Sequence, residues 1–140
     1  MSLNRVIGGL LLFALTGAVS AAPWPLEIID RLDDTRIVIY INESDIEQSP
    51  VWDPARGAPG FGLKDLMKSV AAWEKKNKGP DADGIEKIEL KPIVHHEKQG
   101  RWYYLVQLRD KVDGKRTHRY LAVLMSGKAV AAIREPESYK

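Results

Sequence analysis

The stretch from Arg101 to Met125 reads RWYYLVQLRDKVDGKRTHRYLAVLM, and its pattern decides the fold. Two runs rich in aromatic and aliphatic residues flank Asp113-Gly114, a dipeptide that supports a two-residue hairpin turn. The middle of each run is apolar at nearly every position, which is typical of strands covered on both faces. We therefore expect an antiparallel hairpin in the centre of a sheet.

The segments on either side of this hairpin extend the sheet. Residues 85–94, IEKIELKPIV, alternate between apolar and charged positions, which is typical of a strand with one buried face. Pro92 cannot donate a hydrogen bond to a neighbouring strand, so it indicates an edge strand or a break. After the Ser126-Gly127 turn, residues 128–134, KAVAAIR, complete a meander of four strands.

One helix is expected before the sheet. Gly62 to Pro80 reads GLKDLMKSVAAWEKKNKGP, and its apolar residues recur at the spacing of one helical face. Lysines near the end of this segment suit the negative carboxyl end of a helix, and Gly79-Pro80 stops it. The fold class expected is α+β, with one main helix packed on a four- to five-stranded antiparallel meander.

The segment before the helix contains a strand and a loop. Residues 35–42, TRIVIYIN, are rich in β-branched side chains, and this strand is the candidate fifth member of the sheet. Residues 49–62, SPVWDPARGAPGFG, carry three prolines and three glycines and therefore predict a loop.

The first residues have the three parts of a secretory signal peptide. Arg5 gives a basic start, Val6 to Val19 form an uncharged apolar run, and small residues follow. The run is shorter than the roughly 20 residues that a spanning helix needs. We expect cleavage after Ser20 or Ala21, because Pro23 directly after the cut would obstruct the peptidase. The expected location is periplasmic or secreted, with no membrane span after cleavage.

These boundaries divide the chain into four parts. They are a signal peptide (1–21), an N-terminal strand and loop that pack on the domain (22–62), the helix and sheet (63–134), and a polar tail (135–140). The sequence contains no cysteine, so an exported domain of this length folds without disulfide bonds.

The order of these elements resembles the PepSY-type domain, a peptidase-propeptide family. The resemblance covers Gly62 to Ile133, and the matching positions are Ile88, Leu90, Tyr104, Val106, the Gly127-Lys128 turn and Val130. The family usually has an aspartate before the final turn, where this chain has Leu124-Met125-Ser126. The resemblance implies a helix on a small antiparallel sheet and an extracytoplasmic, non-enzymatic module, in some members associated with restraining peptidases. It brings no catalytic residues.

A helix covers only one face of a hairpin that is apolar on both. Strand alternation places Tyr104 and Val106 on one face, and Tyr103 and Leu105 on the other. Residues 22–62 are the expected cover for the second face, and a partner is the alternative. If the cover is partial, the surface that contacts a protein or peptide partner is formed by Tyr103, Leu105 and Val123.

Trp52 and Phe61 are large aromatic side chains in an otherwise polar loop. Aromatic residues on loops often contact partners. The alternative is that both rings fold back onto the core as anchors, since each buries on the order of 200 Å². Trp52 and Phe61 therefore join the three sheet residues as candidate partner-binding residues.

The sequence predicts no metal site, no cofactor and no catalytic residue. His95 and His96 are neighbours, and neighbouring residues of a strand point to opposite faces, so the pair could ligate one metal ion only at a turn or bulge; solvent-exposed histidines at the end of a strand are expected instead. Asp81-Ala82-Asp83-Gly84 is too short for a calcium loop. A cysteine nucleophile, a G-x-S-x-G elbow and a phosphate-binding glycine loop are all missing.

Taken together, the sequence favours an exported, non-catalytic binding or inhibitory module of the bacterial envelope. Nucleic acid is not an expected partner, because basic and acidic residues are interleaved and export removes the usual ligand. One alternative is a small periplasmic hydrolase with a carboxylate or histidine site, for which His118 is the candidate. The other is an interaction subunit that forms a homodimer through its apolar sheet face.

Overall fold

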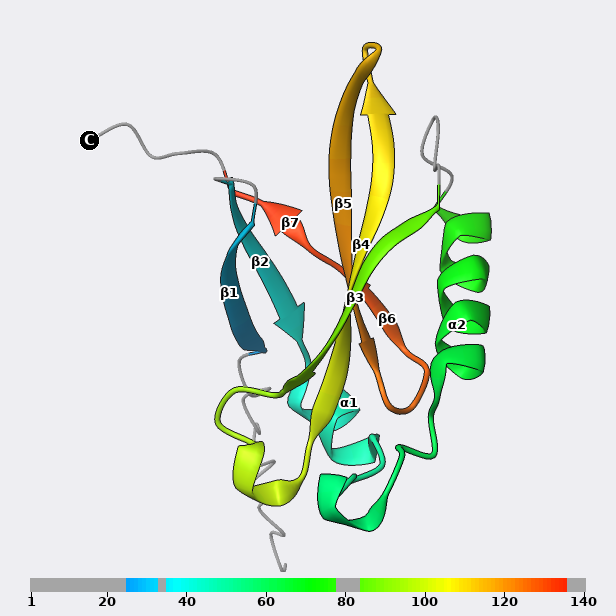
Figure 1. The fold of residues 1–140 in the computed structure, drawn as a ribbon. Helices are drawn as coiled ribbons and strands as arrows, with labels where there is room; N and C mark the ends of the chain where they lie inside the picture. Colours follow the sequence, from blue (N-terminus) through cyan, green and yellow to red (C-terminus); the bar gives the residue numbers. More distant parts are fainter. Residues whose placement is uncertain (1–24, 33–34, 78–83, 136–140) are drawn as a thin grey trace, which may run out of the picture.

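The protein is an α+β structure with two antiparallel sheets (Figure 1). The computed structural model describes residues 25–32, 35–77 and 84–135. The predicted signal peptide, the acidic turn at 81–83 and residues 136–140 of the predicted tail lie outside these ranges.

The described strands fall into a three-stranded and a four-stranded sheet. The first sheet has the order β1 (Leu26–Leu32), β2 (Thr35–Ile41), β7 (Ile133–Arg134). The second has the order β3 (Ile85–Pro92), β4 (Trp102–Val112), β5 (Lys115–Leu124), β6 (Ala129–Ala131). The helices are α1 (Glu43–Gln48) and α2 (Leu63–Lys76), with 3-10 turns at Pro54–Arg56 and Glu97–Gln99.

The predicted meander is confirmed in the second sheet. β4 and β5 pair in register from Tyr103 with Leu124 to Val112 with Lys115. Asp113 and Gly114 join them with φ values of 52° and 75°, as a type I′ turn requires at both central positions. β3 is an edge strand and ends at Pro92, as the missing N–H of proline predicts.

The expectation that all strands belong to one sheet is wrong. β2, predicted as a fifth strand of the meander, pairs instead with β1 and β7. The predicted last strand, residues 128–134, is two strands: β6 pairs with β5, and after Ala132 the chain enters β7 and pairs with β2. The N–H of Ala132 donates to the carbonyl of Tyr120 (2.9 Å), which holds the chain at this change of sheet.

Two buried clusters lie on opposite faces of the four-stranded sheet. Figure 1 shows β1 and β2 on one side of this sheet and α2 on the other. The first cluster lies between the sheets and contains Ile28, Ile37, Ile39, Ile41, Ile46, Ile93, Tyr103, Leu105, Tyr120, Ala122 and Leu124. The second contains Leu66, Val70, Tyr104, Val106, Leu108, Leu121, Val123 and Met125. The cover expected from residues 22–62 is therefore present.

α2 begins and ends close to the predicted positions. The carboxylate of Asp65 accepts a hydrogen bond from the N–H of Gly62 (3.2 Å), which satisfies a donor at the start of the helix. Lys75 and Lys76 lie in the last turn, where positive charge is favourable. Asn77 donates from both its backbone and its side chain to the carbonyl of Trp73.

An ion pair joins the two sheets at their edges. Lys91 of β3 donates to the carboxylate of Asp30 in β1 over 2.8 Å. Burial by itself raises the pKa of Asp30, but the hydrogen bonds from Lys91 and from the N–H of Arg31 outweigh it and lower the pKa overall. This pair links the edge of the first sheet to the edge of the second.

Among the residues that the structure describes, no helix is both long enough and apolar enough to cross a membrane.

Candidate functional site

The loop that carries Trp52 is tied to the four-stranded sheet. The N–H of Trp52 donates to the carbonyl of Gly100 (2.9 Å), and its indole lies edge-on to that of Trp102, with ring centroids 5.1 Å apart. The indole N–H donates to the carbonyl of Gly57 (2.9 Å), which folds the loop back on itself. A side chain at Gly100 would place its Cβ 3.1 Å from the carbonyl oxygen of Trp52, so glycine permits this close approach.

The end of the loop is held in a similar way. The hydroxyl of Tyr104 donates to the carbonyl of Phe61 over 2.6 Å, and the two ring centroids are 6.1 Å apart. Burial, with the negative charge of Asp65 as a smaller cause, raises the pKa of Tyr104. The hydroxyl therefore keeps the proton that it donates, and the position of Phe61 is fixed relative to β4.

Between these two anchors lies a hollow of about 330 Å³. We call it the loop pocket, and it is lined by Pro50, Val51, Trp52, Gly60, Phe61 and Met125. Met125 follows β5 and is buried, whereas Val51 is 61% exposed. None of the described lining residues is charged, and the volume is at the lower end of the range for ligand sites, so the pocket suits one apolar group.

Trp52 and Phe61 combine the two roles that the sequence left open. Both are partly buried against the second cluster, so they are anchors, and both line the loop pocket. Sequence reasoning therefore found two residues of this site. It missed Met125, because nothing in the sequence places the end of β5 beside the loop.

Tyr103, Leu105 and Val123 do not form a surface. Tyr103 and Leu105 are buried between the sheets, where β1 and β2 cover them, so the partial cover on which their contact role depended is not found. Burial, followed by the negative charges of Asp30 and Glu89, raises the pKa of Tyr103 to about 12. Val123 is also buried, so the candidate contact surface is corrected to the loop residues alone.

Val123 lies on the other face from its two companions. It stands opposite Tyr104 in the β4–β5 register, and its side chain belongs to the cluster that contains Leu66 and Val70 of α2. The alternation within each strand could be predicted, but the pairing between strands could not, and the pairing decides which residues share a face.

The three histidines make different contacts. His95 is exposed in the turn after β3, while His96 pairs with Glu43 of α1 (3.2 Å). His118 of β5 lies 2.6 Å from the carboxylate of Glu86 in β3. Within the described ranges, no group of three or more histidine, cysteine or acidic side chains is placed to hold a metal ion. His96 therefore ties a turn to a helix, and His118 ties two strands.

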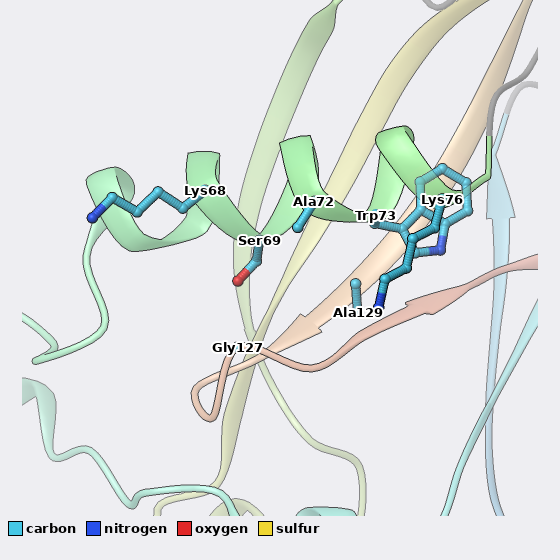
Figure 2. Close-up of a pocket in the computed structure, with 7 residues that line it drawn as sticks. All are labelled: Lys68, Ser69, Ala72, Trp73, Lys76, Gly127 and Ala129. Carbon is cyan, nitrogen blue, oxygen red and sulfur yellow. The ribbon is translucent and has the colours of Figure 1, made fainter.

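A second hollow, of about 440 Å³, lies between α2 and the turn after β5 (Figure 2). We call it the basic groove, and it is lined by Lys68, Ser69, Ala72, Trp73, Lys76, Gly127 and Ala129. Sequence reasoning gave the lysines near the end of α2 only the role of stabilising its carboxyl end. The signal that could have found the groove is the two-turn spacing of Lys68 and Lys76 with the small Ala72 between them.

Comparisons with protein-family models, with curated proteins and with solved structures find no match to this chain.

Proposed function

We propose that this protein is an exported, non-catalytic binding module of the bacterial envelope. Its loop pocket receives one apolar side chain of a protein or peptide partner. The observation that carries the proposal is an apolar hollow whose two aromatic walls are fixed in place by hydrogen bonds to Gly100 and Tyr104.

A pocket that is already formed supports binding because less order must be gained when the partner arrives. Binding a flexible loop costs conformational entropy, and fixing that loop in advance reduces the cost. Here the N–H of Trp52 donates to the carbonyl of Gly100 in the turn before β4, and the carbonyl of Phe61 accepts from the hydroxyl of Tyr104 in β4. The exposed Val51 at the pocket gives an arriving side chain further apolar surface to cover.

The resemblance to the PepSY-type domain supports the same role. The residues that carry it, 62–133, contain α2 and the meander. Under this proposal the domain is PepSY-like and restrains or positions its partner, and a peptidase is the class of partner that the resemblance implies. The loop pocket belongs to the segment before the meander and to Met125 after β5.

Export is tested by fractionating cells that produce the full chain and measuring the mass of the periplasmic product. We expect that product to lack residues 1–20 or 1–21, because the small residues there follow the apolar run. Full-length protein retained in the cytoplasm would contradict the proposed location.

The loop pocket is tested by NMR with ¹³C-labelled methionine methyl groups. Met125 lines the pocket, while Met67 is 52% exposed on α2 and serves as an internal reference. The probes are blocked pentapeptides, Gly-Ser-X-Ser-Gly, in which X is leucine, phenylalanine or alanine. We expect the leucine or phenylalanine peptide to shift the Met125 signal and leave Met67 unchanged, with an affinity on the order of millimolar. The alanine peptide should have little effect.

A pair of matched variants locates the binding. Val51→Asp places a carboxylate at the pocket, and burying that charge against a peptide costs free energy. We expect the peptide affinity to fall by about tenfold or more, which corresponds to about 1.4 kcal/mol. Val112→Asp is the control, because Val112 is similarly exposed (51%) and lies at the end of β4. Equal affinities in the two variants, or an unmoved Met125 signal at the solubility limit of every peptide, would reject the pocket.

A further inference from the structure

Two hollows lie along β6, which is an edge strand of the four-stranded sheet. The basic groove is lined by Ala129, the first residue of β6, and a smaller hollow of about 190 Å³ is lined by Ala131, the last residue of β6. The residues that line the smaller hollow are Ile37, Trp73, Arg119, Tyr120, Ala131, Ala132 and Arg134. Trp73 lines both hollows, and we call the two together the track along β6.

β6 presents free backbone groups along this track. Among the described strands, β6 pairs only with β5. The bonds from Leu124 N–H to the Lys128 carbonyl and from Ala132 N–H to the Tyr120 carbonyl enclose the short ladder. Hydrogen-bonded pairs alternate in an antiparallel ladder, so Val130 is bonded to β5, whereas Ala129 and Ala131 direct their N–H and C=O groups outward. Such an edge is ready to pair with another strand.

Small side chains create the room beside this edge. Ala72 of α2 and Ala129 of β6 contribute only methyl groups to the groove, as Figure 2 shows. Gly127 keeps the turn close to the helix: a Cβ there would lie 3.3 Å from the Ser69 hydroxyl and 3.4 Å from the Phe61 ring. The helix and the turn are thus held beside each other with a gap between their small residues.

The charge along the track is positive. Its basic residues are Lys68, Lys76, Arg119 and Arg134, and none of the described lining residues is acidic. Arg119 is already paired with Asp110 at 2.7 Å. In the described part of the chain, neither Lys68 nor Lys76 forms an ion pair, so their charges are available to a ligand.

The two lysines set a spacing. They are eight residues apart on α2, which corresponds to about 12 Å along a helix. Figure 2 shows them at opposite ends of the groove. In an extended strand, residues i and i+4 lie about 13 Å apart and point to the same face. A strand lying beside β6 therefore brings acidic residues at i and i+4 to the two lysines.

We propose that the β6 edge captures an extended acidic peptide segment by strand addition, with acidic side chains at i and i+4 bound by Lys68 and Lys76. Position i+2 of that segment lies under Ala72 and Trp73 and takes a small residue. This site is separate from the loop pocket and does not depend on the function proposed for it. Main-chain hydrogen bonds to β6 provide the affinity for the segment, and the spacing of its acidic side chains provides the specificity.

The test uses the full chain and a blocked seven-residue peptide, Thr-Glu-Val-Ala-Val-Glu-Thr. Binding is measured by calorimetry and by the indole N–H signal of Trp73 in NMR spectra. We expect the peptide to bind at least about tenfold more tightly than the same peptide with glutamine in place of both glutamates. Its affinity should fall as salt is raised, because the lysines are exposed. Equal affinity for the two peptides would overturn the proposal.

Two matched double variants separate the groove from general surface charge. Lys68→Gln with Lys76→Gln should reduce the affinity to that of the glutamine peptide, while Lys64→Gln with Lys75→Gln removes the same charge from exposed positions of α2 outside the groove. The second pair should leave the affinity within about twofold. An equal loss in both pairs would show non-specific attraction and refute the site.

Strand addition is tested separately from charge. Two methylated peptides are used, one with methyl groups on the backbone nitrogens of even positions and one with them on odd positions. Each form removes the N–H donors from one edge of the peptide, and the form that removes the donors facing β6 should not bind. Unchanged affinity for both methylated forms would show that acidic groups bind without strand pairing, and the proposal would be wrong. Met125 reports the loop pocket and should not shift with this peptide, so the two sites succeed or fail independently.

Discussion

Replacing Tyr103 with alanine is expected to destabilise the protein by about 3–5 kcal/mol. Tyr103 is 1% exposed and lies between the two sheets with Leu105 and Ile39. Removing its ring leaves a cavity that two paired sheets cannot readily collapse to fill. The measurement is the free energy of unfolding from chemical denaturation followed by circular dichroism.

Tyr40→Ala is the matched control. Tyr40 lies on β2 and is 39% exposed, so its loss should change the stability by about 0.5 kcal/mol or less. A Tyr103 variant as mild as the Tyr40 variant would mean that β1 and β2 do not cover this face. Tyr103 would then be the contact residue that the sequence allowed.

The burial of Tyr103 can also be tested at alkaline pH. The pKa of Tyr103 is raised to about 12 in the folded protein, above the value of about 10 for an unfolded chain. The neutral form is therefore favoured by folding, and its contribution to stability is complete below pH 10 and is lost as pH rises towards 12. Absorbance at 295 nm should show one tyrosine, absent in Tyr103→Phe, that ionises only near pH 12 or on unfolding.

Leu66→Ala should cost about 2–5 kcal/mol. Leu66 is fully buried and contacts the cluster that contains Val106 and Leu121 of the four-stranded sheet. The loss is expected to detach α2, because a helix of this length gains most of its stability from the face that it buries. Chemical denaturation measures the change, and the helical signal at 222 nm reports whether α2 separates first.

Leu63→Ala tests the same helix at a position that is 62% exposed. It removes the same number of atoms from the same helix, at its first residue. We expect a change of about 0.5 kcal/mol or less. If the two leucine variants unfold at the same denaturant concentration, the buried face of α2 has been assigned to the wrong side.

The meander could be predicted because its signals are local. Asp113-Gly114 predicts a tight hairpin turn, and Pro92 predicted an edge strand or a break, of which the structure shows the edge strand. β4 and β5 carry apolar residues on both faces, and the prediction that each face is covered is confirmed. The second sheet could not be predicted, because a run such as Ile37 to Ile41 pairs equally well with any strand that presents its edge. The strand with which this run pairs depends on the space left beside the four-stranded sheet.

The candidate sites divide in the same way. Trp52 and Phe61 could be named from the sequence, because large aromatic rings in a polar loop need a packing partner or a ligand. The lysines of the basic groove could not be distinguished from the other lysines of α2. Their role depends on Ala129 and Gly127, which lie more than fifty residues later in the chain.

The sequence by itself determined the hairpin, its turn and the one-sided helix, because each follows from the conformation of adjacent residues. Only the tertiary structure decided that β1 and β2 form a separate sheet over Tyr103, and that the chain changes sheets at Ala132. The physical reason is that strand pairing and face packing join residues far apart in the chain. Their free energies depend on register and available space, which no local pattern of residues encodes.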